Sequence, residues 1–260
     1  MISYIIPTIW KSKFIFKQIE QFKQINDNKA ELIIIDNTNS DFEDNHPQIK
    51  VLKMPENIFV NPAWQLGVNL SSNDRVCIIN DDIYFNLPRF HKFVLDTKVK
   101  AVCYNSKTYK TLEDSSEWKL VANPNPNRRP PGIGQMMYLH KENWTELPWG
   151  MKLWYGDDII YYYHTLIRNI PFHYIEGMAI LGEQSVSVTS DIVPQEMRQP
   201  FTKDTLEYYK KMHTLGLETC TVMPDNDLMA VKMAYHYGDI EQKLEYEKKL
   251  HELINGEENL

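Results

Sequence analysis

The sequence RVCIINDDIY, residues 75–84, decides the fold class. A short apolar run of strand length ends there in an amide and two adjacent carboxylates, Asn80, Asp81 and Asp82. In an open α/β sheet, such polar residues follow a buried parallel strand at its carboxyl edge, where ligands bind. Divalent cations take carboxylate oxygens together with phosphate oxygens and water. The stretch therefore indicates a site for a phosphate-bearing ligand, although a strand followed by an ordinary polar turn fits it equally well.

The same pattern occurs twice before this stretch. Residues 2–8 and residues 31–37 each begin with an apolar run of strand length and end in polar or turn-forming residues. Residues 14–25 lie between them and repeat apolar side chains near helical spacing. A strand, a helix and a strand in this order form a parallel pair joined by a right-handed crossover. Asp36 and Asp82 are therefore predicted at the same edge of one sheet.

A short helix is predicted directly before residues 75–84. Asn61 matches an N-cap and Pro62 a first helical residue, and apolar residues follow as far as Leu70. A shorter strand is expected over residues 50–54. The first 85 residues thus alternate strands and helices, as a nucleotide-binding α/β sheet does.

After Asp82 the alternation is less regular. One helix is expected near residues 90–94, and another is expected to begin at Asp157 and Asp158. We expect the chain to divide into a domain of residues 1–195 and a C-terminal helical extension of residues 196–260. The remaining predicted elements are strands over 100–104, 118–122, 132–139, 173–181 and 185–189, and helices over 204–212 and 227–253.

Residues 123–132 form a loop that carries Arg128 and Arg129 among Asn, Pro and Gly residues, which favour turns. The loop is either an ordinary connection or a mobile lid. A lid would contact a phosphate or an acceptor, because the arginine fork matches phosphate oxygens.

Asp157 and Asp158 stand where a helix is predicted to begin. A capping aspartate that also complements the helix dipole contributes about 0.5–2 kcal/mol. One aspartate is enough for capping, so the second is available for chemistry. The aromatic residues before the pair either face a sugar or a base or belong to the core; they are Trp149, Trp154 and Tyr155.

The chain has 260 residues, a net charge of -7 and a pI near 5.6. This acidic balance argues against a protein that coats nucleic acid by bulk electrostatics and leaves only local contacts. The three cysteines have no paired spacing, which favours reduced thiols. No apolar run approaches the ~18 residues that span a bilayer. We therefore expect a soluble cytoplasmic protein.

Taken together, these segments resemble the GT-A fold nucleotide-sugar glycosyltransferases, particularly the family 2-like group. Each motif alone is weak, and their order and separation over residues 2–190 make the resemblance specific. The matching segments are IIPT at residues 5–8, IIDNT at 34–38, residues 61–69, NDD at 80–82, GIGQM at 132–136 and GDD at 156–158.

The resemblance implies an α/β GT-A fold with a Rossmann-like, mostly parallel sheet flanked by helices. Residues 1–85 would form the nucleotide-sugar half and residues 86–195 the acceptor half. The resemblance also implies that Asp82 binds Mn²⁺ or Mg²⁺ and that Asp158, or as second choice Asp157, is the catalytic base of an inverting transfer. The implied nucleotide-sugar-binding residues are Pro7, Thr8, Asp36, Asn37, Asn61, Asn80 and Asp81, with Asp36 on the base ring; the implied acceptor-binding residues are Arg128, Arg129, Gly134, Gln135 and Trp154.

Two positions depart from the family pattern. Asn80 takes the first place of the Asp-x-Asp motif, so it supplies no carboxylate there, although it can bond a ribose or a metal-bound water. The late histidine that often completes the metal site is missing from residues 181–185. Glu183 either replaces it as an oxygen ligand or faces solvent.

The predicted function is metal-dependent transfer of a sugar from a UDP-sugar to a hydroxyl acceptor. The Asn-, Lys-, Ile- and Tyr-rich composition resembles that of a product of an AT-rich genome, and a phage is one candidate source; the protein would then act in the cytoplasm of a host cell. Phage enzymes of this broad type glycosylate hydroxymethylated cytosine in DNA. Arg128 and Arg129, with Lys107, Lys110 and Lys119, would then contact backbone phosphates. The alternatives are a surface polysaccharide or lipid-linked glycan as acceptor, and a non-catalytic nucleotide-sugar-binding protein.

Overall fold

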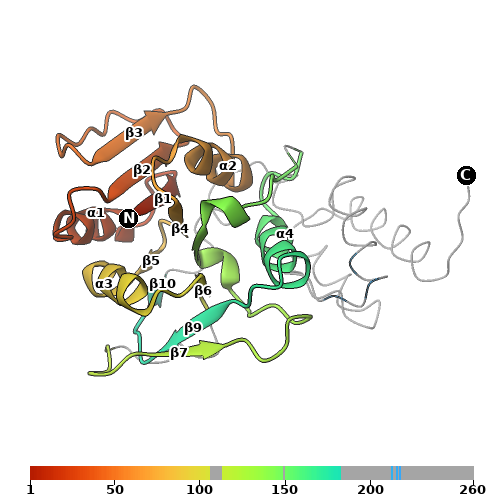
Figure 1. Ribbon diagram of the computed structural model, residues 1–260. Coiled ribbons are helices and arrows are strands. Elements are labelled where there is room, and N and C mark those ends of the chain that lie inside the picture. The colour runs from red at the N-terminus through yellow and green to blue at the C-terminus, as the bar shows by residue number, and fades with distance from the viewer. Residues whose placement is uncertain (106–112, 149, 183–211, 213–214, 216, 218–260) are drawn as a thin grey trace, which may run out of the picture.

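The structure is a computed structural model that describes residues 1–105, 113–148, 150–182, 212, 215 and 217. Within this part of the chain, helices flank a large central sheet (Figure 1). The sheet has eight strands in the order β3-β2-β1-β4-β8-β6-β9-β7. Its strands are β1 (Ile2–Thr8), β2 (Glu31–Asp36), β3 (Ile49–Lys53), β4 (Arg75–Ile79), β6 (Ala101–Cys103), β7 (Lys119–Ala122), β8 (Met136–His140) and β9 (His173–Glu176).

Two further strands, β5 (Ile83–Tyr84) and β10 (Leu181–Gly182), form a separate antiparallel pair. The α-helices of the described residues are α1 (Phe14–Lys23), α2 (Val60–Leu70), α3 (Leu87–Thr97) and α4 (Gly156–Tyr162). Short 3₁₀ turns cover Ile133–Gln135 and Lys141–Asn143, and a π-helical turn, Tyr163–Ile167, continues α4.

The first half of the sheet is parallel. Strands β3, β2, β1 and β4 pair side by side in one direction, and Thr8 at the end of β1 is in register with Asp36 at the end of β2. The predicted alignment of the carboxyl ends of β1, β2 and β4 at one edge is therefore confirmed. Beyond β4 the sheet is mixed, since β8 runs antiparallel to both β4 and β6. β8 follows β7 along the chain through a loop and a 3₁₀ turn, and both of these strands run opposite to β4, β6 and β9.

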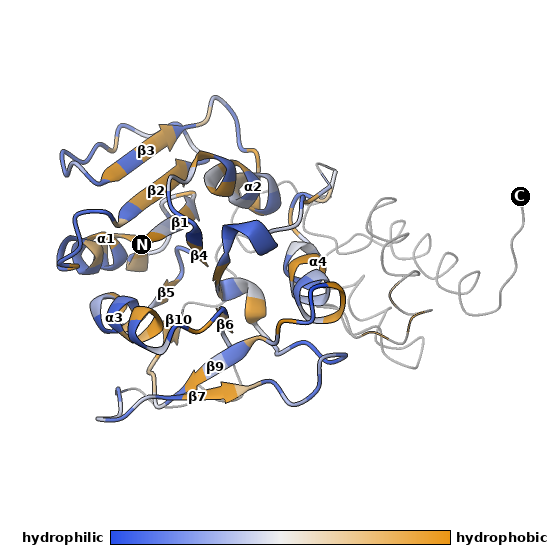
Figure 2. Ribbon diagram, viewed as in Figure 1, coloured by the Kyte–Doolittle hydropathy of each residue, from blue (hydrophilic) through white to orange (hydrophobic). Residues whose placement is uncertain are grey.

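The central strands are buried on both faces, which explains their continuous apolar sequences. On one face, Tyr4 and Ile6 pack with residues of α1 and α3. On the other face, Ile5 packs with residues of α2 and α4. Figure 2 shows hydrophobic residues along β2, whereas α1 and α3 carry hydrophobic and hydrophilic residues together, as helices with one buried side do.

Three predicted boundaries are wrong. The expected strand over 132–139 starts only at Met136, because residues 133–135 form a 3₁₀ turn after Gly132, whose φ is 78°. The expected strand over 173–181 ends at Glu176, where Gly177 takes a φ of 87°. Helix α2 has Phe59, not Asn61, as its N-cap.

Several expectations fall outside the described residues. They are the strand over 185–189, the helix over 227–253 and nearly all of that over 204–212, and the side chains of Lys107, Lys110, Trp149, Glu183 and Cys220. Within the described part, Cys77 and Cys103 are buried free thiols. No helix of that part is long and apolar enough to cross a membrane.

Candidate active site

The carboxyl ends of β1, β2 and β4 are connected by hydrogen bonds. The Asn37 backbone N–H donates to the Thr8 carbonyl oxygen at 2.9 Å. The Thr8 hydroxyl donates to Asp81 Oδ2 at 2.6 Å. Thr8 thus links the end of β2 to the acidic turn after β4, and three of the predicted nucleotide-sugar-binding residues lie together.

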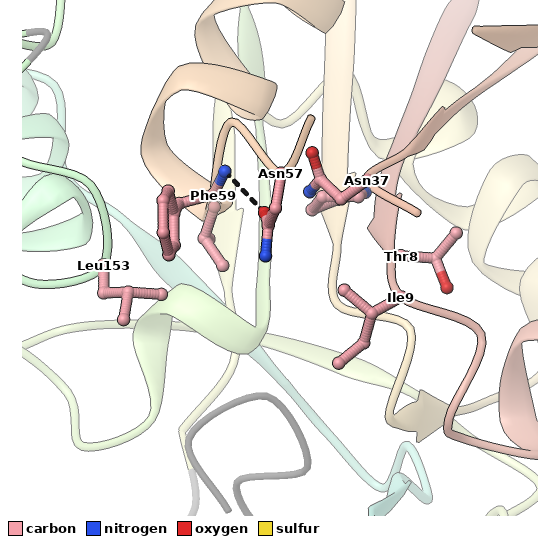
Figure 3. A pocket seen from close by; sticks show the side chains of 8 residues that line it. Thr8, Ile9, Asn37, Asn57, Phe59 and Leu153 are labelled. Atoms are coloured by element: carbon pink, nitrogen blue, oxygen red, sulfur yellow. Dashed lines mark hydrogen bonds between the residues drawn. The ribbon is translucent and has the colours of Figure 1, made fainter. Parts of the chain in front are cut away.

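A hollow lies beside these strand ends (Figure 3). Thr8, Ile9 and Asn37 line one side of it, and Asn57 and Phe59 face them across the opening. Pro7, Val60 and Leu153 complete the lining. The sequence predicts Pro7, Thr8 and Asn37 as binding residues; it gives no such prediction for the other five lining residues, which are Ile9, Asn57, Phe59, Val60 and Leu153.

Phe59 holds an unusual backbone conformation at this hollow. Its φ of 67° and ψ of -178° lie in a region that is nearly restricted to glycine. The Asn57 side chain accepts a hydrogen bond from the Phe59 N–H at 2.8 Å, and Lys152 Nζ lies 5.0 Å from the centre of the Phe59 ring. A strained residue kept at a hollow by such contacts is a mark of a binding site.

Asp36 has a different environment from the one predicted for a base-binding acid. Its Oδ1 accepts hydrogen bonds from Thr38 N and Oγ1, and its Oδ2 accepts from Ser40 N and Oγ, at 2.6–2.9 Å. Burial acts to raise the pKa of this carboxyl, but these four bonds outweigh it and lower the pKa. A carboxylate offers about four acceptor positions. Asp36 therefore shapes the turn of residues 36–40 with its side chain, and its bond to the base stays a prediction.

Asp81 and Asp82 follow β4 and are both nearly buried, with 4% and 7% of their surfaces exposed. No group of three or more His, Cys, Asp or Glu side chains arranged for a metal occurs among the described residues. A pair of carboxylates nevertheless fits Mg²⁺ or Mn²⁺ in a nucleotide site, since such ions use one or two carboxylates and fill their shell with phosphate oxygens and water.

The turn after β4 is joined to the predicted acceptor side. The Asn80 backbone N–H donates to the Gln135 carbonyl oxygen at 2.9 Å. One residue earlier, a Cβ built on Gly134 would lie 3.0 Å from Asp157 Oδ2. The acids after β4 and the acids of α4 therefore flank the same short segment, residues 134–135.

Asp157 and Asp158 do not cap α4 with their side chains, although both lie in its first turn. They pair with Arg129 instead. Arg129 Nη2 donates to Asp157 Oδ2, and Arg129 Nε lies 2.9 Å from Asp158 Oδ1. The side chains of Arg129 and Asp158 are 8% and 0% exposed, and that of Asp157 is 15% exposed. The capping prediction is wrong because α4 begins at Gly156 with Tyr155 as its N-cap, so both acids lie inside the first turn.

The loop of residues 123–132 packs onto α4. The Tyr161 hydroxyl donates to the Arg128 carbonyl oxygen at 3.2 Å, and the Tyr162 hydroxyl donates to the Asn127 carbonyl oxygen at 3.2 Å. Burial raises the pKa of Tyr161 to about 12, so its hydroxyl stays protonated and continues to donate. Arg128 is exposed, whereas Arg129 is buried against the acids. The loop thus has the contacts of an anchored connection, the first of the two alternatives.

Asn61 connects the starts of α2 and α4. Its Nδ2 donates to the carbonyl oxygens of Met151 and Trp154 at 2.7 and 3.0 Å. A Cβ on Gly156 would lie 2.2 Å from Asn61 Oδ1, so this contact requires glycine. Asn61 is buried behind the hollow, and the structure assigns it to the segment that carries Trp154 and the acid pair.

No protein-family model and no curated protein sequence matches the chain. Solved structures of TarS from S. aureus do match it. One aligns with 99% of this chain and 49% of its own, with a TM-score of 0.56 and 13% identity. TarS 1–349 aligns with 100% of this chain and 93% of its own, with a TM-score of 0.52 and 11% identity.

A third structure is TarS 1–349 in complex with UDP-GlcNAc. It aligns with 98% of this chain and 80% of its own, with a TM-score of 0.54 and 12% identity. The chain spans about half the length of the longer TarS chain. At this level of identity the likeness concerns the fold, and the chain has a mixed α/β fold similar to that of TarS.

Proposed function

We propose that the chain is a GT-A glycosyltransferase that moves a sugar from a UDP-sugar to a hydroxyl acceptor. The observation that carries the proposal is the meeting of three features at one sheet edge: the hollow beside Thr8 and Asn37, the pair Asp81–Asp82, and the pair Asp157–Asp158. The fold supports it, since the glycosyltransferase TarS has a similar fold and binds UDP-GlcNAc in one structure.

In this proposal the nucleoside lies across the mouth of the hollow, whose narrow interior has room for little more than a water molecule. Asn37 and Asn57 supply amides and backbone groups for the base and ribose, and Phe59 supplies an apolar wall. Asp81 and Asp82 would hold Mn²⁺ or Mg²⁺, which would supply charge neutralisation for the diphosphate. Thr8 orients Asp81 through its hydroxyl, so the carboxylate keeps one direction toward the ligand.

The acid pair of α4 supplies the proton acceptor for an inverting transfer. The acceptor O–H proton moves to a carboxylate while the acceptor oxygen bonds to the anomeric carbon. The bond from that carbon to the diphosphate breaks, and its electron pair leaves on UDP. Gly134 lies against Asp157, and the Gln135 carbonyl oxygen is bonded to Asn80 in the turn after β4; these two contacts support the proposal that both chemical functions share one site.

The acceptor is proposed as a hydroxyl group carried by a glycan or by hydroxymethylated DNA. Arg129 is removed from the residues predicted to contact DNA, because it is buried and paired with Asp157 and Asp158. Arg128 and Lys119 are exposed and stay as predicted phosphate contacts. Transfer reactions with both acceptor classes decide between them.

The donor and metal are tested with the Asp82→Ala variant. Mn²⁺ added with UDP should raise the melting temperature of the native protein by ligand linkage, and this rise should vanish in the variant. Transfer from UDP-sugars, followed by mass analysis of the acceptor, should vanish with it. The exposed Asp96 on α3 is the matched control, and Asp96→Ala should behave as native. Full activity in excess chelator would exclude the metal, and absence of turnover with every UDP-sugar would leave a binding protein.

A further inference from the structure

The guanidinium of Arg129 lies between the two acids of α4 and directs one nitrogen at each. Nη2 binds Asp157, and Nε lies 2.9 Å from Asp158 Oδ1. These two nitrogens form one edge of the planar fork, which usually binds a single carboxylate in bidentate fashion. Here the edge lies between two carboxylates: Nη2 is hydrogen-bonded to Asp157, whereas Nε pairs with Asp158 Oδ1 by charge and distance without hydrogen-bond geometry, so one cation is shared by both acids.

This bridge answers an electrostatic problem. Two adjacent carboxylates that are 15% and 0% exposed repel each other, and one of them would take up a proton unless a cation were close. Arginine stays charged at every accessible pH, so it is the residue that holds such a pair ionised. A carboxylate must be ionised to accept a proton from an acceptor hydroxyl.

The position of Arg129 is built by its surroundings. Tyr161 and Tyr162 hold the carbonyl oxygens of residues 128 and 127 against α4. The Asn123 N–H, at the start of the same loop, donates to the Phe172 carbonyl oxygen at 2.9 Å. These bonds place Arg129 over the acid pair from a segment almost thirty residues earlier in the chain.

We propose that Arg129 is a positioning residue that keeps the acid pair ionised and presents Asp157 to the acceptor, with Asp158 as the buried counter-charge. Asp157 is the more exposed of the two and lies against Gly134 on the acceptor side. This inference rests on the proposed glycosyl transfer. It replaces the sequence-based preference for Asp158 as the base, because Asp158 is fully buried.

Two substitutions separate charge from geometry. Arg129→Gln removes the charge, so kcat should fall about 10- to 100-fold and the acidic limb of the pH–rate profile should move to higher pH. Arg129→Lys keeps the charge but cannot contact both acids with one planar group. The acidic limb of the pH–rate profile should therefore keep its native position, whereas kcat should still fall. KM for the UDP-sugar should be unchanged in both. Arg168→Gln, at an exposed position beyond α4, is the control and should leave both quantities native.

A second readout needs no activity. In Arg129→Gln the two acids repel, so its melting temperature should lie below that of the native protein at pH 7, and this deficit should shrink as the pH falls and one acid is protonated. Adding Asp157→Asn to Arg129→Gln should restore the melting temperature at pH 7. This non-additivity is the signature of direct coupling.

Each outcome decides the inference. A raised KM with an unchanged pH profile would place Arg129 on the donor phosphates and overturn the positioning role. Arg129 would be a structural residue only if Arg129→Gln lost stability and activity equally, kept the native pH–rate profile, and had a melting-temperature deficit that did not change with pH. If the native protein turns over no UDP-sugar, the proposed function fails, and the melting series still decides whether Arg129 holds the pair ionised.

Discussion

Gly134 has no Cβ atom, and the space that a Cβ would need is taken by the carboxylate of Asp157. The nearest atoms to a Cβ built there belong to Asp157, at 3.0–3.1 Å, which is tighter than ordinary van der Waals contact. The backbone at Gly134 has no positive φ that would itself demand glycine. Glycine is therefore required at residue 134 because of the Asp157 side chain, and a larger residue there would change the orientation of that side chain.

We therefore expect Gly134→Ala to displace Asp157 without unfolding the protein. A shift of about 1 Å at a reacting group costs up to ~100-fold in rate, so kcat for sugar transfer should fall by about 10- to 100-fold. The melting temperature should change little. Gly182→Ala is the control, because its Cβ would meet its nearest atom at an ordinary 3.5 Å. If Gly134→Ala kept the native kcat, the orientation of Asp157 would not limit sugar transfer, and the prediction would be wrong.

Between elements, one buried amide couples the start of α2 to the segment before α4. Asn61 binds the carbonyl oxygens of Met151 and Trp154 with its side chain, and its own N–H donates to the Lys152 carbonyl oxygen at 2.9 Å. The segment then reaches Tyr155, whose φ is 63°, and enters α4. The two helix starts thus behave as one unit, with the hollow on one side and the acid pair on the other.

Asn61→Ala should loosen this unit. One buried and one partly buried carbonyl oxygen lose their donor, so the free energy of unfolding should fall by about 1–3 kcal/mol in urea denaturation. Amide hydrogen exchange should quicken at residues 151–157, where the lost bonds lie. Asn69 lies on α2 and is exposed, so Asn69→Ala should change neither quantity. Uniform exchange across the variant would argue against a local link.

The sequence predicts correctly those strands in which nearly every residue is buried. β1, β2 and β4 read as apolar runs because both faces are covered, and their parallel order follows from the helices between them. The start of α2 was misplaced, since Asn61 and Pro62 satisfy the local capping rules and the amide is used by a segment ninety residues away instead. Local rules cannot anticipate such a tertiary partner.

The same limit applies to the site. The sheet edge could be predicted, because Asp36 and Asp82 each follow a buried strand. The partners of Asp36 could not, although Thr38 and Ser40 nearby are the kind of residues that close such a turn. The pairing of Arg129 with Asp157 joins segments with no local signal in common, so only the packing of the 123–132 loop on α4 reveals it.

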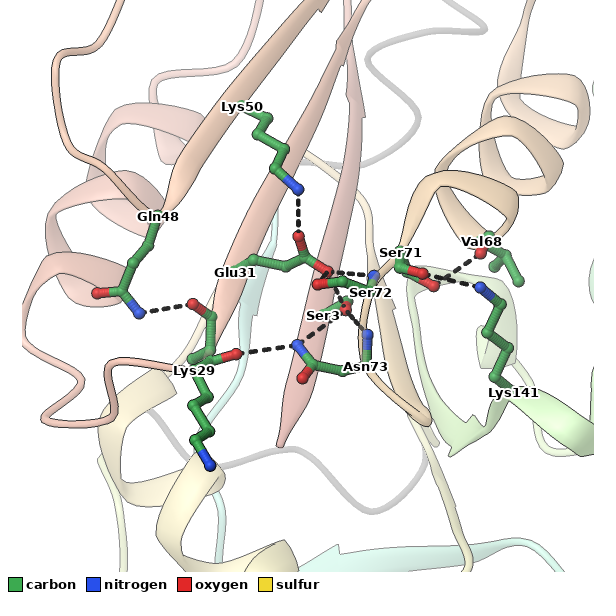
Figure 4. A network of polar contacts seen from close by, with 11 residues as sticks. Ser3, Lys29, Glu31, Gln48, Lys50, Val68, Ser71, Ser72, Asn73 and Lys141 are labelled. Atoms are coloured by element: carbon green, nitrogen blue, oxygen red, sulfur yellow. Dashed lines mark hydrogen bonds and ion pairs between the residues drawn. The ribbon is translucent and has the colours of Figure 1, made fainter.

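Across the whole molecule, the amino edge of the sheet carries a polar network opposite the candidate active site (Figure 4). Glu31 at the start of β2 accepts hydrogen bonds from the Ser3 hydroxyl of β1 and from the N–H and hydroxyl of Ser72 before β4. Lys50 of β3 donates to its other oxygen at 2.7 Å. One carboxylate therefore ties together the amino ends of four neighbouring strands.

This carboxylate should make stability depend on pH. Burial acts to raise the pKa of Glu31, but Lys50, Ser3 and Ser72 outweigh it and lower the pKa to about 2 from 4.5. The folded state thus binds the proton less readily than the unfolded state. The stability that Glu31 contributes is complete above pH 4.5 and is lost as the pH falls toward 2.

We expect Glu31→Gln to lower the free energy of unfolding by about 1–3 kcal/mol at pH 7, because a charged acceptor of four hydrogen bonds is replaced by a neutral amide. In urea denaturation this difference should narrow steadily between pH 4.5 and pH 2.5, as the native carboxylate becomes protonated. KM for a UDP-sugar should stay native, since the network lies at the edge away from the hollow. Glu43→Gln is the matched control: Glu43 pairs with Lys53 at 3.5 Å on the surface, and such pairs contribute little. An equal deficit at both ends of the pH range would mean that Glu31 acts by packing rather than by charge.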